Sequence, residues 1–520
     1  MTAKPRLGVS VAVVLLFFAV SRVVYTAGLD VQFNATTIRN YWQIIDPVLL
    51  RGRLAESIFY LHGQPPLFNL FIGIVLKLWP NAYAAVFHAA YIVIGAAFAV
   101  SLLALQRRMR VDPRVALALT VLFVVAPATV KYENWLFYTY PVAALLCAAA
   151  LFLHRHLDSG SPTDGLAFYA LLAAVVLTRG IYPVAWFALV AAAVALTAPH
   201  LRRITLRAAA APLALLLLFS LKQLIVFGTL GAGSAFMGPN LATRIRKQAD
   251  PELVAELVRE KRISGALRLP QFRKISLYYK HIGTPKPTGI PLLDTELKST
   301  GAVNTNHIGY LAVSRIQMRD VVYMITHYPM LYVKSFAGTG GYFRPSGDDA
   351  LASYQHNEPR MRAVSDAWDV LVCGQRNDRG PGWNLIVGLP LLLGFATCLL
   401  IRGLRVPAID LPHEFTLGFA LVTTLYTSGL TVALSSGDYN RYRFKVDAFY
   451  VLFLGIALSA VVGYVGRKRG AGTARADASP GSLDGLPGTA GKARSKKASS
   501  GRPPRPRTSG ASRSRGRGSE

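Results

Sequence analysis

Long apolar runs dominate the pattern of hydrophobic and polar positions along this 520-residue chain. About 20 apolar residues in helical form match the hydrocarbon thickness of a bilayer, so a run of that order predicts a membrane span. Such runs lie near residues 7–27, 82–105, 114–130, 140–154, 165–180, 183–199, 208–228, 384–402, 414–435 and 446–465. The pattern predicts an all-α polytopic membrane protein of about ten transmembrane helices. The first run reaches membrane thickness, so we interpret it as a retained span and not as a signal peptide.

Composition supports a lipid solvent. The chain is 52% hydrophobic and only 16% charged, with a mean hydropathy of +0.35. These values exclude an ordinary soluble globular protein of this length. The three cysteines form no disulfide framework, because two of them, Cys147 and Cys398, fall inside apolar runs.

Basic clusters between the runs predict the orientation. Arg107 and Arg108, for example, follow the second run, and Arg202 and Arg203 precede the seventh. Cytoplasmic loops are rich in Lys and Arg, so these clusters place both termini in the cytoplasm. One apolar stretch, residues 66–79, is too short to span, and we expect it to form a helix in the plane of the outer interface.

This topology predicts four regions. Residues 1–228 form an N-terminal transmembrane module whose first outer loop covers residues 29–81. Residues 229–383 form a small external domain, and residues 384–465 form a C-terminal transmembrane module. Both outer segments are too long to be mere connections. Residues 466–520 form a basic cytoplasmic tail.

The tail explains much of the formal net charge of +30. It holds 14 Lys and Arg against 3 Asp and Glu, with few large apolar side chains, so we expect it to be disordered. Such a segment lies against anionic lipid headgroups. The charge therefore indicates membrane lipids as partners and no specific nucleic acid.

Three outer loops contain cations, although outer loops are normally poor in them. Residues 131–141 hold Lys131, Glu133 and Tyr138 among other aromatics, and Arg179 stands alone in another loop. Residues 437–447 hold three cations at alternate positions, next to a carboxylate: Asp438, Arg441, Arg443 and Lys445. Interfacial anchoring explains a single such residue. The cluster favours a lipid phosphate as ligand.

The first outer loop contains the most specific motif. Asp30 follows the first span directly, and His62-Gly-Gln64-Pro-Pro-Leu-Phe-Asn-Leu precedes the expected interfacial helix. A second span ending in Arg-Arg comes next. This arrangement resembles the GT-C glycosyltransferases, in particular the branch with protein O-mannosyltransferases and the aminoarabinose transferases of lipid A. The resemblance covers the first 110 residues well and the ten-span plan loosely.

In that family, an acidic residue of the first outer loop acts as the base or holds a metal ion, so the resemblance points to Asp30 as catalytic. The usual Asp-Glu pair is absent, because Val31 follows Asp30, and Asp46 and Glu56 therefore stay candidates. A divalent cation is a candidate cofactor, and no other cofactor is implied. The resemblance leaves the metal dependence open.

The remaining polar residues receive roles in the same scheme. Cations stabilise charge that grows on a departing phosphate, so we expect Arg441, Arg443, Lys445 and Lys131 to bind the donor phosphate. We expect a second set to position substrates: His62, Gln64, Glu133, Tyr138 and Asp438. For His62, a buried structural role is an equal alternative.

The function expected is an inverting glycosyltransferase that uses a polyprenyl-phosphate-sugar donor at the outer face of a bacterial plasma membrane. A phosphate is already a good leaving group, so one carboxylate can suffice, unlike the pair in glycosidases. The acceptor would be a cell-envelope glycan, lipid or protein. The alternative is a transporter or flippase of a lipid-linked or anionic substrate. Transporters place charges near mid-span, and the predicted spans are almost free of charge there.

Overall fold

The structure is a computed structural model that describes residues 6–348, 357–377, 380–435 and 437–476. Regular structure in these ranges is helical, and strand pairing there is limited to isolated bridges such as that between Asn34 and Trp135. The protein is therefore all-α, as predicted.

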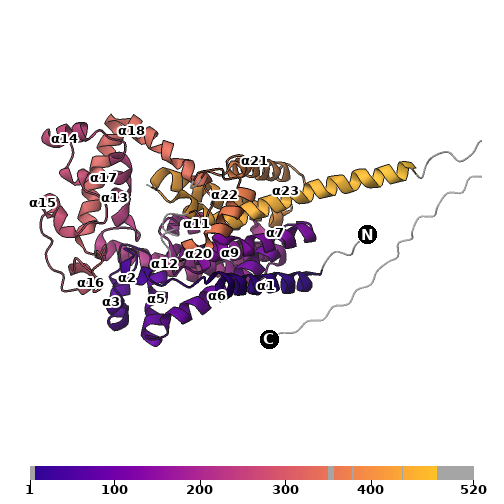
Figure 1. Ribbon diagram of the computed structural model, residues 1–520, viewed down its shortest axis with the longest axis horizontal. Coiled ribbons are helices and arrows are strands. Elements are labelled where there is room, and N and C mark those ends of the chain that lie inside the picture. Colours follow the sequence, from indigo (N-terminus) through magenta and orange to yellow (C-terminus); the bar gives the residue numbers. More distant parts are fainter. Residues whose placement is uncertain (1–5, 349–356, 378–379, 436, 477–520) are drawn as a thin grey trace, which may run out of the picture. The chain divides into compact units, whose positions relative to one another are not determined.

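Every predicted span is a helix. Among the described residues, seven helices are long and apolar enough to cross a bilayer: α1 with a π-helical extension (Leu7–Gly28), α6 (Tyr83–Arg108), α9 (Thr139–Ser159), η2 with α12 (Pro199–Phe227), α21 (Trp383–Leu404), α22 (Leu411–Leu434) and the first part of α23 (Tyr439–Val465). Figure 1 shows several of these helices side by side. The protein is a multi-pass membrane protein.

The third predicted span, residues 114–130, is broken into two helices. Helices α7 (Pro113–Val125) and α8 (Pro127–Glu133) meet at an angle of 55°. Ala126 between them is extended, because a residue before proline is sterically kept out of the helical region. The bend turns α8, which carries Lys131 and Glu133, away from the axis of α7.

The fifth and sixth predicted spans, α10 (Pro162–Thr178) and α11 (Val184–Thr197), have 17 and 14 residues and are shorter than a regular span. They nevertheless connect the same two ends of the bundle as their longer neighbours. Arg179, just after α10, bonds to Tyr138, just before α9, so these two helices run antiparallel. The chain returns through α11 and α12 (Arg202–Phe227) to Ala232, whose carbonyl packs against Gly180.

Short helices build residues 29–81, the predicted first outer loop: α2 (Thr37–Asn40), α3 (Pro47–Gly52), α4 (Leu54–Phe59) and α5 (Pro66–Leu78). Asp46 caps α3, since its side chain accepts from the backbone N–H of Val48, and Pro47 supplies the first turn. The Pro65-Pro66 pair starts α5 in the same way. This helix is the one expected in the plane of the interface.

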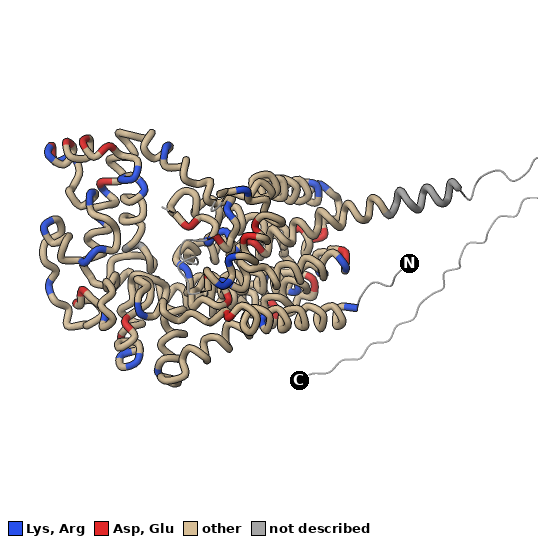
Figure 2. Tube along the Cα trace, viewed as in Figure 1, with Lys and Arg blue, Asp and Glu red and all other residues tan. Residues whose placement is uncertain are grey.

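Residues 229–383 form mostly helices outside the span set, with α13 (Ser234–Arg246) packed along α17 (Gly309–His327). The other elements of this segment are α14 (Pro251–Arg259), η3 (Gly265–Arg268), η4 (Ile275–Tyr278), α15 (Tyr279–Ile282), α16 (Pro291–Asp294), α18 (Pro329–Lys334), η5 (Ser335–Phe343) and α20 (Glu358–Leu371). Small apolar cores, one around Ile245 and Met324 and another around Ile275 and Tyr310, join α13 and α17 to their neighbours among these, whereas α20 packs against α8. Figure 2 shows charges on many turns of α13, α14 and α17, whereas long stretches of the spans lack them.

Many polar contacts tie this segment to the rest, among them those of Asp46 and Arg244. The carboxylate of Asp46 accepts from the N–H and the hydroxyl of Ser299, at 2.5 and 2.6 Å. The Arg244 guanidinium of α13 donates to the carbonyls of Val432 and Ser435 at the end of α22. Cations at a helix C-terminus satisfy carbonyls that have no partner within the helix.

Helix α23 continues to Ala476, so the first residues of the expected disordered tail are helical. The remainder of that tail, residues 477–520, lies outside the described residues.

A buried ion pair joins α1 to the α8–α9 corner. The Arg22 guanidinium donates to both oxygens of Glu133, at 2.8 and 2.6 Å, and Tyr140 donates to the same carboxylate at 2.8 Å. Glu133 has no solvent exposure. Gly95 of α6 makes room for it, because a Cβ there would lie 2.4 Å from Glu133 Oε2. Glu133, expected to position substrates, is thus enclosed by an ion pair.

We predict that Glu133→Gln lowers the free energy of unfolding by about 3–5 kcal/mol, because it leaves the Arg22 charge buried without a counter-ion. Thermal unfolding of the purified protein in detergent measures this. Glu56→Gln is the matched control, since Glu56 is partly exposed and pairs weakly with Arg53 at 3.5 Å. Equal melting temperatures for the two variants would show that the Arg22–Glu133 ion pair does not stabilise the fold.

Candidate functional site

A cavity of about 830 Å³ lies where the first outer loop, α13 and the ends of α10, α22 and α23 meet. Its apolar wall comes from the start of α11, the loop after α12, α13 and the last turns of α22. This wall contains Ile181, Pro183, Leu230, Met237, Leu430 and Leu434.

Cations gather on a second side of the cavity. Arg179 is 6% exposed and donates to the hydroxyls of Tyr138, at 2.5 Å, and Tyr442, at 2.9 Å. Arg441 pairs with Asp438 at 3.2 Å. Lys247, just beyond α13, also lines the cavity. This side forms a positive centre at the beginning of α23.

Aromatic rings and amides form a third side. Trp42 stacks on Phe272 with ring centroids 4.1 Å apart and meets Phe236 edge-on at 4.6 Å. Four amide side chains line the same cavity: Gln43, Gln64, Asn240 and Gln271. One cavity therefore combines an apolar wall, a cationic centre and a wall typical of polar neutral ligands.

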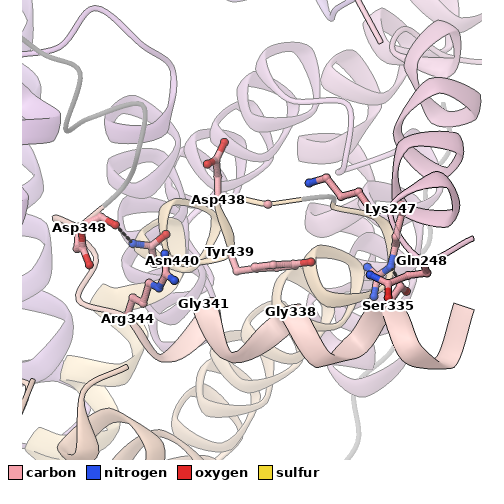
Figure 3. A pocket seen from close by; sticks show the side chains of 12 residues that line it. Lys247, Gln248, Ser335, Gly338, Gly341, Arg344, Asp348, Asp438, Tyr439 and Asn440 are labelled. Atoms are coloured by element: carbon pink, nitrogen blue, oxygen red, sulfur yellow. Dashed lines mark hydrogen bonds between the residues drawn. The ribbon is translucent and has the colours of Figure 1, made fainter. Parts of the chain in front are cut away.

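A smaller cavity of about 230 Å³ adjoins the first and shares Lys247, Gly437 and Asp438 with it. Figure 3 shows the Tyr439 ring lying over η5 near Gly338 and Gly341, with Lys247 on one side and Arg344 on the other. Asp438 stands where the two cavities meet. It is the carboxylate that the described lining of the larger cavity provides.

Three of the predicted site residues line the larger cavity: Gln64, Asp438 and Arg441. Two others lie immediately behind it. Tyr138 accepts the bond from Arg179, and the buried Lys445 ammonium lies 4.1 Å from the centroid of the Tyr442 ring. The structure thus brings together five residues from distant parts of the sequence.

The structure does not bring Arg443 or Lys131 to either cavity. All three nitrogens of the Arg443 guanidinium are bonded internally, to Asp447, Ser346 and the carbonyl of Tyr342. Lys131 pairs with Glu358 at 2.8 Å. Arg441 lines the larger cavity and Arg443 does not, because alternate positions at the start of a helix point to different sides.

The two carboxylates that the sequence predicted as catalytic also lie away from the cavity lining. Asp30 has a 66% exposed side chain, a left-handed backbone (φ 52°) and an ion pair with Arg360 at 2.9 Å. Asp46 is committed to the cap of α3 and to Ser299. Glu56, the third candidate, is paired with Arg53.

Sequence reasoning gave no role to Arg179, Lys247 or Trp42. Arg179 did carry a signal, as a lone cation in a short outer loop. Lys247 and Phe272 had none, because their neighbours in the cavity are far away in the sequence.

His62 lies next to the cavity without lining it. Its Nε2 is 2.8 Å from the carbonyl of Asn306, its ring packs on Phe227, and it is 1% exposed. Burial lowers the pKa of His62 to about 4, so the ring is neutral at physiological pH. The contacts support the structural alternative for this residue.

The metal question can be tested against the donor atoms. Across the described part of the chain, no group of three or more His, Cys, Asp and Glu side chains is arranged to hold a metal ion. The described residues therefore do not offer the side-chain donors of a divalent cation site.

No model of a known protein family and no curated protein matches the sequence. Solved structures similar to the chain include an Archaeoglobus fulgidus oligosaccharyltransferase (TM-score 0.37, 14% identity over 87% of this chain and 49% of that one). Another is ArnT from Cupriavidus metallidurans bound to undecaprenyl phosphate (TM-score 0.29, 14% identity, 85% of this chain and 78% of that one). The chain spans about half the length of the oligosaccharyltransferase.

At TM-scores below 0.5 a superposition assigns no role to a residue. The function proposed below is therefore argued from the chain's own cavity.

Stability should depend on pH through His62. Its pKa is lower in the folded protein (about 4) than in the unfolded chain (about 6.5), so the unfolded chain binds the extra proton between these values. The free energy of unfolding should fall as the pH drops from about 6.5 to about 4. His62→Gln should flatten this dependence, measured as melting temperature against pH. His200→Gln, at an exposed position, should leave it unchanged. Parallel curves for both variants would contradict the prediction.

Proposed function

We propose that the protein is a membrane glycosyltransferase that takes a sugar from a polyprenyl-phosphate donor. The observation that carries the proposal is the combination, in one cavity, of an apolar wall, a cationic centre and an aromatic and amide wall. A lipid-linked sugar has the same three parts: a hydrocarbon chain, a phosphate and a polar neutral ring.

The apolar wall supports a hydrocarbon ligand. Leu230 and Met237 line the cavity and are nevertheless 74% and 46% exposed. Large apolar side chains left open beside a cavity in a membrane protein favour contact with lipid. A prenyl chain can pass from the bilayer to the cavity along this wall.

The cationic centre supports a phosphate. Arg179 and Arg441 both present planar guanidinium groups, which bind phosphate through charge-assisted bonds. The cavity lining also includes Gly437 and the first turn of α23. The N-terminus of a helix favours an anion, since its N–H groups and dipole are directed at it.

The reaction needs one carboxylate, and Asp438 is placed for it. We assign Asp438 the role of general base. The oxygen of the acceptor hydroxyl forms a bond to the anomeric carbon, and the proton of that hydroxyl goes to Asp438. The bond from that carbon to the phosphate oxygen breaks, and its electron pair leaves with the lipid phosphate. Attack from the face opposite the phosphate inverts the anomeric carbon. The cations stabilise the departing charge.

The basic loops support placing this reaction at the outer face of a bacterial plasma membrane, with both termini in the cytoplasm. The acceptor is a cell-envelope molecule with a free hydroxyl. A flippase of the same lipid would use the same phosphate contacts, so it differs from a transferase in needing no proton acceptor.

Arg179→Ala and Arg441→Ala should each weaken binding of polyprenyl phosphate by about 1.5–3 kcal/mol and slow transfer, because each removes a cation from the phosphate. Binding of radiolabelled lipid phosphate to purified protein measures this. Arg362→Ala is the matched control, an exposed arginine on α20. Equal lipid affinity in all three variants would contradict the phosphate site.

Asp438→Asn should lower turnover by roughly 10²–10⁴ while the lipid donor still binds, because the amide cannot accept the proton. Asp30→Asn and Asp46→Asn test the carboxylates that the sequence predicted. An active Asp438→Asn beside an inactive Asp30→Asn would move the base to Asp30. Full transfer with all three changes, together with altered lipid movement across vesicles, would favour the flippase.

A further inference from the structure

Three aromatic rings form a platform on one side of the larger cavity, and we call Trp42, Phe236 and Phe272 the aromatic platform. They come from three separate segments: the first outer loop, α13 and the loop between η3 and η4. Ring centroids lie 4.1 Å (Trp42 to Phe272), 4.6 Å (Trp42 to Phe236) and 5.7 Å (Phe236 to Phe272) apart. Trp42 and Phe272 stay partly exposed, so the platform offers ring surface to the cavity.

Phe272 occupies its place at a cost in backbone energy. Its φ is 60°, in the left-handed region that is a genuine outlier for a bulky residue. Strain of this kind persists only where surrounding contacts hold it, and it is frequent at ligand-binding sites. Here the contact is the stack on Trp42. A less strained backbone would point the ring elsewhere, so the strain serves the platform.

Amides beside the platform have hydrogen-bonding capacity to spare. Gln43 is 6% exposed, and its Oε1 has no hydrogen-bond donor among the described residues; the same is true of Gln271 Oε1. Both residues line the cavity, as do Gln64 and Asn240. A buried carbonyl oxygen without a donor is costly. Both oxygens are closed off from water, so a ligand hydroxyl reaches them only when the amide side chain turns toward the cavity.

We propose that the aromatic platform binds a neutral sugar ring of the acceptor, so that the acceptor is a glycan. This inference rests on the proposed glycosyltransferase function. The C–H face of a sugar packs on aromatic rings, and its hydroxyls donate to amide oxygens. The charged lining residues belong to the Arg179, Arg441, Lys247 and Asp438 group, so the platform side selects a neutral ligand.

The acceptor fits the platform better than the donor sugar does. The donor sugar is bonded directly to the phosphate and must therefore stay at the cationic centre on α10 and α23. The platform instead belongs to segments outside the span helices. A volume of about 830 Å³ lies in the upper part of the roughly 300–1,000 Å³ range of ligand sites, which leaves room for a second ring.

The test measures binding of neutral disaccharides of hexoses and of pentoses to purified protein by isothermal calorimetry. A peptide of eight residues with Ser and Thr is the non-carbohydrate probe. Trp42→Ala should weaken disaccharide binding about tenfold. Phe272→Gly should do the same, although glycine relieves the backbone strain.

Conservative and control variants separate stacking from folding. Trp42→Phe and Phe272→Tyr keep a ring and should stay within about threefold of the unchanged protein. Trp383→Ala, an exposed tryptophan at the start of α21, should have no effect on binding. The same variants are assayed for melting temperature and for affinity toward polyprenyl phosphate and its glycosylated form.

Several results would overturn the proposal. These are absence of disaccharide binding, tighter binding of the peptide, a fall in melting temperature with unchanged disaccharide affinity, or a loss confined to the glycosylated lipid. The last would assign the platform to the donor sugar. Failure of the proposed transferase function gives a different result. In that case Arg179→Ala would bind lipid phosphate as tightly as the unchanged protein, while disaccharide binding would still depend on Trp42.

Discussion

Burial of charge in an apolar helical bundle is the constraint on which the rest of this structure depends. A charge removed from water must find a counter-ion or a set of hydrogen bonds, and this requirement is strict where the surroundings are apolar. Arg22 meets it with Glu133, and Arg443 meets it with Asp447 and two oxygen atoms. These arginines are locked to their own surroundings and hold neighbouring helices together.

Arg179 meets the same requirement in another way. Its partners are the hydroxyls of Tyr138 and Tyr442, which are neutral, so its positive charge is not cancelled by a carboxylate. A cation held by neutral partners beside a cavity keeps an attraction for an anion. Both side chains are buried arginines at helix ends. Arg179, with its neutral partners, is suited to bind an anion, whereas Arg443, paired with a carboxylate, stabilises the structure.

The segments between the span helices complete the site that the bundle begins. Helix α13 contributes Phe236, Met237 and Lys247 to the cavity, and its Arg244 binds the end of α22. The first loop contributes Trp42 and Gln64 and is fixed by Asp46 to Ser299. Apolar, cationic and aromatic walls thus come from different parts of the chain, and their meeting lets one cavity suit a ligand with three chemical parts.

The sequence by itself determined the helical, membrane-spanning class of the protein. Apolar runs of bilayer length have no other stable form in lipid, so each run became a helix at nearly the predicted place. It also singled out Gln64, Asp438 and Arg441, because polar residues in an outer loop stand out against an apolar background. The short lengths of α10 and α11 were less visible, since Pro162, Pro183 and the residues around Arg179 decide where those helices begin and end.

Tertiary structure decided which polar residues share a site. Spacing along a loop cannot show that Arg443 turns inward while Arg441 faces a cavity, because successive positions of a helix point in different directions. Nor can it show that Asp30 bonds to Arg360, 330 residues away, or that Trp42 meets Phe272. The sequence records which charges and rings are present, and only the packing of distant segments decides which of them are enclosed by partners and which are left facing a ligand.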